Sequence, residues 1–477
     1  MNVRLAREST VWPRAVLIRG TPSLVRHSFD VKPIALQTYL SLSRGRDRRE
    51  VRGLRFYGKP IMLSLLLVAA CLGAEPADIT ATPASIPLTL PVGPYSTHST
   101  TLQSLTYVDL TTPGYMARGI ERRARSAALL GGNVVWFTDL PADPVVVELY
   151  VRIYRQYGME IVAGSGEWYA YANKPGAYGR LRAVYDALPA DARPYMWTLG
   201  DETAPGNLTT LAALAQQCRD GGIPATMTTV QEYHASTLTA LSGRLSTVTC
   251  DYYPIFVPGL SSNPPYGSAA LTRFIDVCRT TTNRAVAGGV RPVMMTQGYG
   301  DNTLYALPTP AQTEWQIWTS LLNGSRGNYV FIHGMPSPDG VAPAPPSLVD
   351  WRRPGDELLT AQGQAVAAAY KRLPAVATWF AQGTAEAKPL TTTTLTAGDG
   401  VGVLRTADGR RLLVVVADPL QPKRSHILRL PGTKQVAPLA QSQPATVMTW
   451  PWPWSLSIPT MVTVEVAPGS AWLGELR

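Results

Sequence analysis

Residues 195–202 read Tyr195-Met196-Trp197-Thr198-Leu199-Gly200-Asp201-Glu202, an apolar run that ends in two acids. An apolar run without regular polar alternation is typical of a strand that is buried on both faces. Residues 208–220 then have helical periodicity, which ends at Gly221-Gly222, a common stop signal for a helix. The stretch therefore predicts one strand–helix unit of a parallel sheet, with two carboxylates at the carboxyl end of the strand.

The same unit recurs along the chain on both sides of this stretch. Eight apolar strands are predicted at residues 105–110, 133–140, 159–164, 195–199, 225–230, 246–250, 292–296 and 328–332, with a closing helix at 361–373. Eight such units over roughly 250 residues are typical of a (β/α)8 TIM barrel. An open doubly wound sheet is the alternative, but no Gly-rich phosphate loop follows the first predicted strand.

The segments around the predicted barrel differ from it in composition. Residues 75–100 are rich in Pro, Thr and Ser and predict a linker, so that the barrel domain would span residues 101–383. From residue 384 to 477 short Thr-rich and Val-rich runs alternate with turns, and Ala407-Asp408-Gly409 separates two of them as in a hairpin. We therefore expect a small C-terminal antiparallel β-sandwich at 384–477.

Positive charge is concentrated at the start of the chain. The first 61 residues hold thirteen Lys and Arg against four acids, whereas the remaining residues hold 30 against 29. A basic tail can bind nucleic acid or a membrane surface, but an apolar core at residues 62–71 follows it directly. That core is too short to span a bilayer and has the length of a signal-peptide core, so export is the better interpretation and no nucleic-acid partner is expected.

We therefore expect residues 1–74 to be a leader whose signal core lies at 62–74. Val68-Ala69-Ala70-Cys71 also resembles a bacterial lipobox, in which Cys71 would be lipidated and would anchor the protein to a membrane. Either interpretation predicts an exported protein that is periplasmic, extracellular or lipid-anchored at the cell surface.

The sequence has no motif for a cofactor or a metal. The cysteines beyond the leader, Cys218, Cys250 and Cys278, have no CxxC spacing, and the histidines occur singly. No G-x-S-x-G elbow lies between a predicted strand and helix. We therefore expect neither a zinc site, nor a cofactor, nor a serine nucleophile.

Acidic and aromatic side chains cluster at the carboxyl ends of the predicted strands, where TIM barrels hold their functional groups. The acids are Asp109, Asp139, Glu167, Asp201, Glu202, Glu232, Asp251 and Asp301. The aromatic residues and the one histidine are Trp136, Trp168, Tyr169, Tyr171, Tyr252, Tyr253, Tyr299 and His333. A single such acid is more often a helix cap or a solvated loop residue, but acids and aromatic faces together are typical of a carbohydrate site.

Three passages carry a family resemblance: residues 195–202, Asp251-Tyr252-Tyr253-Pro254, and residues 318–327 before the eighth strand. Together they resemble clan A glycoside hydrolases, including the family 42 β-galactosidase type. The resemblance implies that Glu202, at the end of the fourth strand, is the general acid/base. Two positions depart from that pattern: Asp201 stands where the clan usually has Asn, and Gln297 ends the seventh strand where the nucleophilic Glu is expected.

Because an amide cannot act as a carboxylate nucleophile, three interpretations stay open. Asp251, or alternatively Glu167, supplies the second carboxylate; or Asp201 and Glu202 serve a substrate-assisted reaction; or the barrel binds carbohydrate without cleaving it. The predicted catalytic residues are Glu202, Asp251 and Glu167. The predicted substrate-binding residues are Asp201, Asp109, Asp139, Trp136, Trp168, Tyr252, Gln297, Tyr299 and His333.

Overall fold

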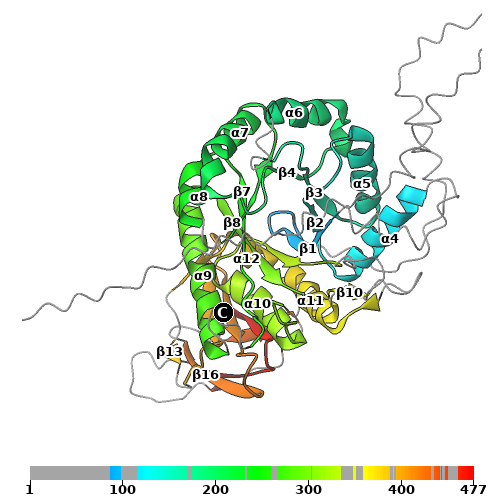
Figure 1. Ribbon diagram of the computed structural model, residues 1–477. Helices are drawn as coiled ribbons and strands as arrows, with labels where there is room; N and C mark the ends of the chain where they lie inside the picture. Colours follow the sequence, from blue (N-terminus) through cyan, green and yellow to red (C-terminus); the bar gives the residue numbers. More distant parts are fainter. Residues whose placement is uncertain are drawn as a thin grey trace, which may run out of the picture. The chain divides into compact units, whose positions relative to one another are not determined.

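The computed structural model describes residues 86–97, 115–169, 175–230, 234–258, 267–301, 303–334, 347–350, 358–386, 390–391, 394–430, 435–440, 442, 446–448 and 460–477. Within residues 86–382, parallel strands lie at the centre and helices surround them (Figure 1). Antiparallel strands make up most of the remainder. The chain thus has the predicted fold class, a TIM barrel followed by a β-sandwich.

Parallel pairing joins the strands of the barrel in the order β5-β4-β3-β2-β1-β9-β8-β7-β6. These strands are β1 (Val92–Ser96), β2 (Val134–Phe137), β3 (Glu160–Gly164), β4 (Met196–Thr198), β5 (Ala225–Thr226), β6 (Thr228–Val230), β7 (Thr247–Asp251), β8 (Arg291–Gln297) and β9 (Asn328–Phe331). β5 and β6 are consecutive halves of one segment, of which the first pairs with β4 and the second with β7. The ring therefore closes through this segment, which excludes the open doubly wound sheet.

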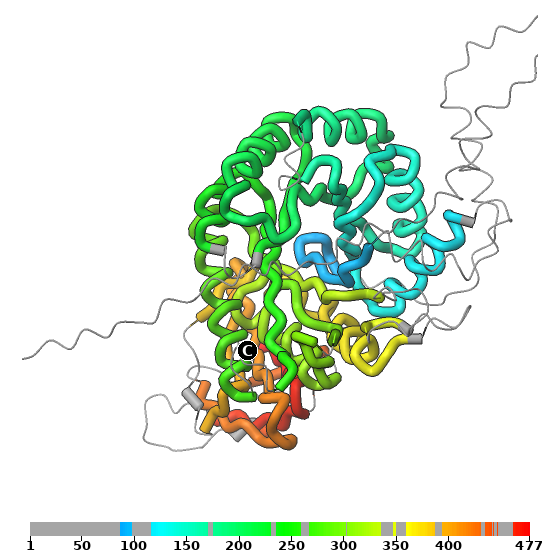
Figure 2. Tube along the Cα trace, in the orientation of Figure 1, coloured from blue at the N-terminus to red at the C-terminus, as the bar shows by residue number. Residues whose placement is uncertain are grey.

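The first strand of the ring is not where the sequence predicted it. β1 pairs with β2 on one side and with β9 on the other, so residues 92–96 belong to the barrel and not to a linker. In Figure 2 the blue tube of this segment lies inside the ring of helices. The predicted strand at 105–110 lies outside the described residues. The sequence Val92-Gly93-Pro94-Tyr95-Ser96 was missed because Gly and Pro are typical of loops.

Alternate residues of each barrel strand face opposite sides, and both sides are apolar. In β2, Val134 and Trp136 belong to a cluster that fills the barrel, whereas Val135 and Phe137 pack against the helices outside it. The helices are α4 (Tyr115–Leu129), α5 (Pro144–Gln156), α6 (Ala177–Ala187), α7 (Leu208–Asp220), α8 (His234–Leu241), α9 (Ser268–Ala287), α10 (Pro310–Leu322), α11 (Ala361–Arg372) and α12 (Ala377–Gln382). This burial on both faces explains why the strands read as continuous apolar runs.

Local capping signals set where helices begin after the strands. The Asp143 side chain accepts a hydrogen bond from the Val145 amide, and Pro144 occupies the first turn of α5. Thr309 and Gln312 form a reciprocal capping box at the start of α10, which also begins with Pro310. These caps fix where α5 and α10 begin. The loop residues between each strand and the following cap can therefore contribute side chains to a site.

The C-terminal region is a sandwich of two antiparallel sheets. One sheet has the order β12-β14-β15-β20-β17 and the other β13-β16-β19-β18. The strands are β12 (Thr384–Ala385), β13 (Leu390–Thr391), β14 (Gly400–Arg405), β15 (Arg411–Val416), β16 (Arg424–Leu430), β17 (Val436–Pro438), β18 (Thr446–Met448), β19 (Thr460–Val466) and β20 (Ala471–Leu476). Inward-facing residues of both sheets, such as Val415, Val464 and Trp472, form a core of their own.

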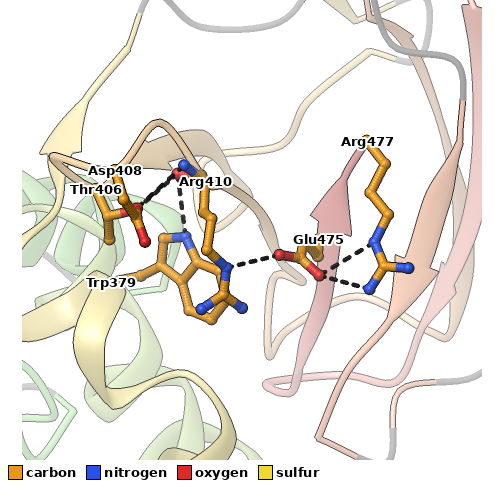
Figure 3. A network of polar contacts seen from close by, with 6 residues as sticks. All are labelled: Trp379, Thr406, Asp408, Arg410, Glu475 and Arg477. Carbon is orange, nitrogen blue, oxygen red and sulfur yellow. Dashed lines mark hydrogen bonds and ion pairs between the residues drawn. The ribbon is translucent and has the colours of Figure 1, made fainter.

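The sandwich packs on the last helices of the barrel. Trp379 of α12 donates a hydrogen bond to the carbonyl of Arg410, whose guanidinium lies 4.3 Å from the centroid of the same ring. Arg410 also contacts Glu475 of β20 at 2.9 Å, and Glu475 in turn pairs with Arg477 (Figure 3). The cation–π contact and the hydrogen bond thus hold the hairpin between β14 and β15 against α12, and the ion pair with Glu475 ties the same hairpin to β20.

The predicted leader at 1–74, its signal core and Cys71 lie outside the described residues, as does the predicted linker up to residue 85. In the part of the chain that the structure describes, no helix combines the length and the apolar character needed to cross a bilayer. Export and lipidation therefore stay predictions.

The place of β1 in the barrel predicts that Gly93→Ala is destabilising. A Cβ at residue 93 would lie 1.8 Å from the backbone oxygen of Val134, so the two strands would have to separate. We expect the free energy of unfolding, measured by urea denaturation, to fall by roughly 1–3 kcal/mol. Gly206→Ala is the control, because a Cβ there meets no atom within 4 Å. Equal stability of the two variants would contradict the assignment of residues 92–96 to the barrel.

Candidate functional site

Glu202 occupies a constrained turn directly after β4. Its backbone has a φ of 48°, which is in the left-handed region and costs a non-glycine residue roughly 1–2 kcal/mol. The Glu202 amide donates a hydrogen bond of 3.2 Å to the carbonyl of Thr228, and the Thr228 amide donates one of 3.1 Å to the carbonyl of Gly200. These two bonds hold the turn against β6, and the Glu202 side chain is exposed. Strain of this kind is common where a side chain must point in a set direction.

Asp251 ends β7 and lies beside the same turn. Its side chain is 5% exposed, and no described donor bonds to its buried Oδ1 atom. Burial first, and then the charge of Glu202 and a hydrogen bond with it, raise the pKa of Asp251 well above its ordinary value. Asp251 therefore keeps its proton to a higher pH than an exposed aspartate does.

Asp201 is the third carboxyl group of this cluster. Burial and the neighbouring charge of Glu202 raise the pKa of Asp201 to about 7, although its hydrogen bond from Tyr95 acts in the opposite direction. The charge of Asp201 also acts on Asp251. The ends of strands β4 and β7 thus bring Asp201, Glu202 and Asp251 together, as the sequence predicted from their positions.

Tyr95 of β1 connects this cluster to the loop after β2. Its hydroxyl lies 2.8 Å from Oγ1 of Thr138 and donates a hydrogen bond of 3.2 Å to Oδ2 of Asp201. Burial, followed by the charges of Asp201 and Asp139, raises the pKa of Tyr95, so the hydroxyl keeps its proton. Sequence reasoning placed Asp139 at the site but missed Tyr95 and Thr138, because β1 was taken for a linker.

A group of aromatic rings lies next to the carboxyl groups. Tyr253 packs against Tyr299 at 5.6 Å and against Tyr305 at 5.4 Å between ring centroids. Phe331 lies 5.4 Å from Tyr253 and 4.8 Å from Tyr95. Burial, and after it the charge of Asp251, raise the pKa of Tyr253. The described rim therefore combines aromatic faces with acids, and Tyr299 is where the sequence predicted it.

Gln297 has a structural role and does not face substrate. Its amide nitrogen donates to the carbonyls of Ile255, Tyr299 and Ala306 at 2.8–3.1 Å, and its Oε1 accepts from the Ile255 amide at 2.9 Å. The side chain is fully buried. These bonds tie the loop after β7 to the loop after β8. The substrate-binding role predicted for Gln297 is therefore wrong, because every polar atom of its side chain already bonds to the backbone.

Four other predicted residues face away from the cluster. Trp168 is fully buried and donates its indole N–H to the carbonyl of Thr198, outside the barrel interior. Tyr252 stacks on Phe274 of α9. His333 is fully buried, and its Nε2 lies 3.0 Å from the hydroxyl of Ser126 on α4. Trp168 and His333 are fully buried, so their predicted roles in substrate binding are corrected to packing between strands and helices. The role predicted for the half-buried Tyr252 stays a prediction.

The fourth is Glu167, which pairs with Arg180 of α6 at 3.7 Å. It is not among the leading influences on the pKa of Asp201 or Asp251, and its role as the second carboxylate stays a prediction. Trp136 lies inside the barrel but is fully buried, with its ring 5.1 Å from that of Tyr329. Asp109 lies outside the described residues.

Hollows elsewhere on the described surface do not coincide with the acids. One of about 530 Å³ is lined by Arg219, Arg244 and the residues that precede β5 and β7, at the amino ends of the strands. Another of about 460 Å³ lies between α7 and α8. In TIM barrels function resides at the carboxyl ends, so we assign the site to the acid cluster. Among the described residues, no group of three or more His, Cys, Asp and Glu is arranged to hold a metal ion.

Comparisons with known proteins gave distant structural similarity only. No protein-family model matches the sequence, and no curated protein matches it. The chain is similar to a family 51 α-L-arabinofuranosidase from Bifidobacterium longum, at 12% identity over 83% of this chain and 97% of that one, with a TM-score of 0.43.

It is also similar to α-galactosidase I from Mortierella vinacea, at 10% identity over 82% of this chain and 98% of that one, with a TM-score of 0.46. A third similar structure is the α-galactosidase from Saccharomyces cerevisiae with raffinose. It matches at 9% identity over 83% of this chain and 99% of that one, with a TM-score of 0.45. These neighbours are glycosidases, but likeness at this level carries no argument about function. The fold is established by the strand pairing of this chain.

The raised pKa of Asp201 predicts how stability depends on pH. An acid whose pKa is about 7 in the folded protein and 3.8 when unfolded binds more protons in the folded state between these values. The free energy of unfolding therefore falls as pH rises from about 4 to about 7. Asp201→Asn should reduce this fall by on the order of 2 kcal/mol. Urea denaturation of both proteins at about pH 4 and about pH 7 measures this fall in the free energy of unfolding. The same fall in the variant as in the parent protein would contradict the raised pKa of Asp201.

The contacts of Gln297 predict that Gln297→Glu destabilises the protein. A carboxylate cannot donate to the three carbonyls, and its charge would be buried among them. We expect a loss of roughly 2–4 kcal/mol in the free energy of unfolding at neutral pH. The matched control is Gln364→Glu on the exposed side of α11, which should change stability little. A stable Gln297→Glu variant would show that position 297 is free to accept a nucleophile.

Proposed function

We propose that this chain is a glycoside hydrolase that acts on an oligosaccharide or polysaccharide, with Glu202 as the general acid/base. The observation that carries the proposal is the hydrogen bond between Glu202 and Asp251 at the carboxyl ends of two barrel strands. Burial and the charge of Glu202 raise the pKa of Asp251, so this carboxyl group keeps its proton to a higher pH than an exposed aspartate does. Cleavage of a glycosidic bond needs an acid for the leaving oxygen and a negative charge near the anomeric carbon, and the pair offers both.

The two carboxyl groups divide these roles by their exposure. Glu202 is exposed and can contact the glycosidic oxygen, whereas Asp251 is buried and hydrogen-bonded to Glu202. In the proposed reaction Glu202 gives its proton to the leaving oxygen as the bond from the anomeric carbon to that oxygen breaks. Water then adds to the anomeric carbon, and its proton restores the carboxyl group. Asp251 and Asp201 supply negative charge next to the positive transition state.

The tyrosines support this assignment. Tyr253 and Tyr299 lie close enough to Asp251 for its charge to raise the pKa of both hydroxyls, after burial as the larger cause. Aromatic faces of this kind pack on the CH faces of sugars, and tyrosine hydroxyls bond to sugar hydroxyls. The resemblance of residues 195–202 to the clan A family 42 type belongs to the same proposal.

One observation favours a second candidate function, carbohydrate binding without cleavage. Glu202 and Asp251 are hydrogen-bonded to each other. Catalytic carboxyl pairs are roughly 5–5.5 Å apart in retaining enzymes and roughly 6.5–9.5 Å apart in inverting ones, which is farther than a hydrogen bond reaches. Cleavage by this pair therefore requires that substrate enter between the two groups, whereas binding alone does not.

We also propose that the protein is exported. The support is in the sequence, where basic residues up to Lys59 precede the apolar core at 62–71. Retention of the core in the mature protein, measured by mass spectrometry of the protein from its own cells, would contradict this. A lipid on Cys71 would show that the protein is anchored to a membrane.

The proposal predicts that Glu202→Gln abolishes hydrolysis. Removing a general acid should lower kcat by roughly 100-fold to 10,000-fold on a panel of aryl glycosides and polysaccharides. Glu148→Gln is the matched control, because Glu148 lies on α5 and pairs with Arg152 at 2.7 Å, and the change should leave kcat unchanged. Tight binding of a polysaccharide by the parent protein with no turnover would favour the non-catalytic candidate. Turnover that survives Glu202→Gln would reject Glu202 as the acid.

A further inference from the structure

Charge is distributed unevenly between the two ends of the barrel. The first seven connections from a strand to the next helix, which start at the carboxyl ends, contain no Arg and a single Lys, Lys174. The acids in these connections are Asp109, Asp139, Asp143, Glu167, Asp201, Glu202, Glu232 and Asp301. The eighth connection adds Arg352 and Arg353 together with four acids. Within the described residues of the first seven connections, the charged side chains are acids only, so the described part of this end is acidic. These acids are Asp139, Asp143, Glu167, Asp201, Glu202 and Asp301.

The opposite end has the opposite sign. The connections from a helix to the next strand contain Arg193, Arg244 and Arg326 against the one acid Asp191. Charges arranged in this way create a field that attracts cations to the acidic end and repels anions from it. The chain beyond its leader is nearly neutral in total, so its net charge does not reveal this separation.

The described site itself shows no compensating cation. For Tyr95, Asp201, Asp251, Tyr253 and Tyr299, the charges that most influence the pKa belong to carboxyl groups and tyrosines. Buried acids are ordinarily paired with Arg, Lys or a metal. No ion pair joins Asp201 or Asp251 to a Lys or Arg among the residues that the structure describes.

A second, independent observation points to the ligand. The Oδ1 atom of Asp251 is buried, in a side chain that is only 5% exposed, and no described N–H or O–H donates to it. An ammonium group supplies three donors and one positive charge, so it would satisfy this oxygen and the cluster's charge together. The aromatic rings of Tyr253 and Tyr299 attract cations through their faces.

We propose that this site takes a positively charged glycoside, an amino sugar with a free ammonium group, in preference to neutral, N-acetylated or acidic sugars. The inference rests on the proposed function for the statement that the ligand is a glycoside. It goes beyond that function by naming the charge of the sugar. A uronic acid is excluded on the same ground, because its carboxylate would face the cluster with no cation between them.

The test compares sugars that differ at one substituent only. The purified full chain is given aryl glycosides of the gluco and galacto series in both anomeric forms, each as the 2-hydroxy, 2-amino, 2-acetamido and 6-carboxylate compound. We expect kcat/KM for the 2-amino compound to exceed that for its 2-hydroxy counterpart by at least about tenfold. We expect this ratio to fall severalfold when NaCl is raised from about 20 mM to about 500 mM, because salt screens charge.

Two variants separate charge from shape. Asp251→Asn should reduce the amino preference, whereas Asp220→Asn at the far end of α7 should leave it unchanged. The salt dependence of the parent protein gives the same information if Asp251→Asn does not fold. The inference would be overturned if kcat/KM were the same for the 2-amino and 2-hydroxy compounds, or higher for the 6-carboxylate compound. It would also be overturned if no amino compound were recognised, or if salt did not change the preference for the amino compound.

The outcomes also distinguish this inference from the proposed function. Glu202-dependent cleavage of 2-hydroxy glycosides without an amino preference would leave the hydrolase standing and reject the charge assignment. Salt-sensitive binding of the 2-amino compounds to the parent protein, measured by calorimetry, with no cleavage of any compound would support the charge assignment and reject the hydrolase.

Discussion

The closure of the ring by backbone hydrogen bonds is the constraint on which the rest of the structure depends. β1 bonds to both β2 and β9, and the segment 225–230 bonds to β4 with its first half and to β7 with its second. No strand of the ring is left with an open edge, and all strands run in the same direction. Their carboxyl ends therefore meet at one rim, which is why Asp201 and Asp251, about fifty residues apart in sequence, influence each other.

Bringing three carboxyl groups together has an energetic cost that the surrounding fold must offset. Burial and mutual repulsion raise the pKa of both Asp201 and Asp251, and the left-handed backbone at Glu202 adds strain. Nothing in the local sequence favours this arrangement. It persists because the apolar clusters inside and outside the strands fix the backbone on both sides of it. Local destabilisation held by a stable scaffold is common at functional sites.

The sequence predicted the barrel because most of its strands are buried on both faces and read as apolar runs. It failed at β1, where Gly93 and Pro94 interrupt the pattern. Gly93 is needed because β1 approaches the backbone of Val134 too closely for a Cβ. Since Tyr95 lies on this strand, the same error removed it from the predicted site.

The remaining errors in the site have a different cause. On a strand that is apolar on both faces, the pattern does not reveal which alternate residues point inward. Asp251 and Tyr253 face the cluster, whereas Tyr252 between them faces α9. His333 and Trp168 likewise pack toward helices. The positions of acids at strand ends could be predicted from sequence, but the direction of their aromatic neighbours required the structure.

The departure at Gln297 follows from the loops that it supports. The loops after β7 and β8 pair with each other at Phe256 and Tyr305, and the Gln297 amide bonds to both loops. A carboxylate there would lose its donors, so the end of the seventh strand is unavailable for a nucleophile. The proposed chemistry therefore uses the carboxyl groups that follow β4 and end β7. The absence of the expected Glu has a structural reason and does not by itself argue against the proposal.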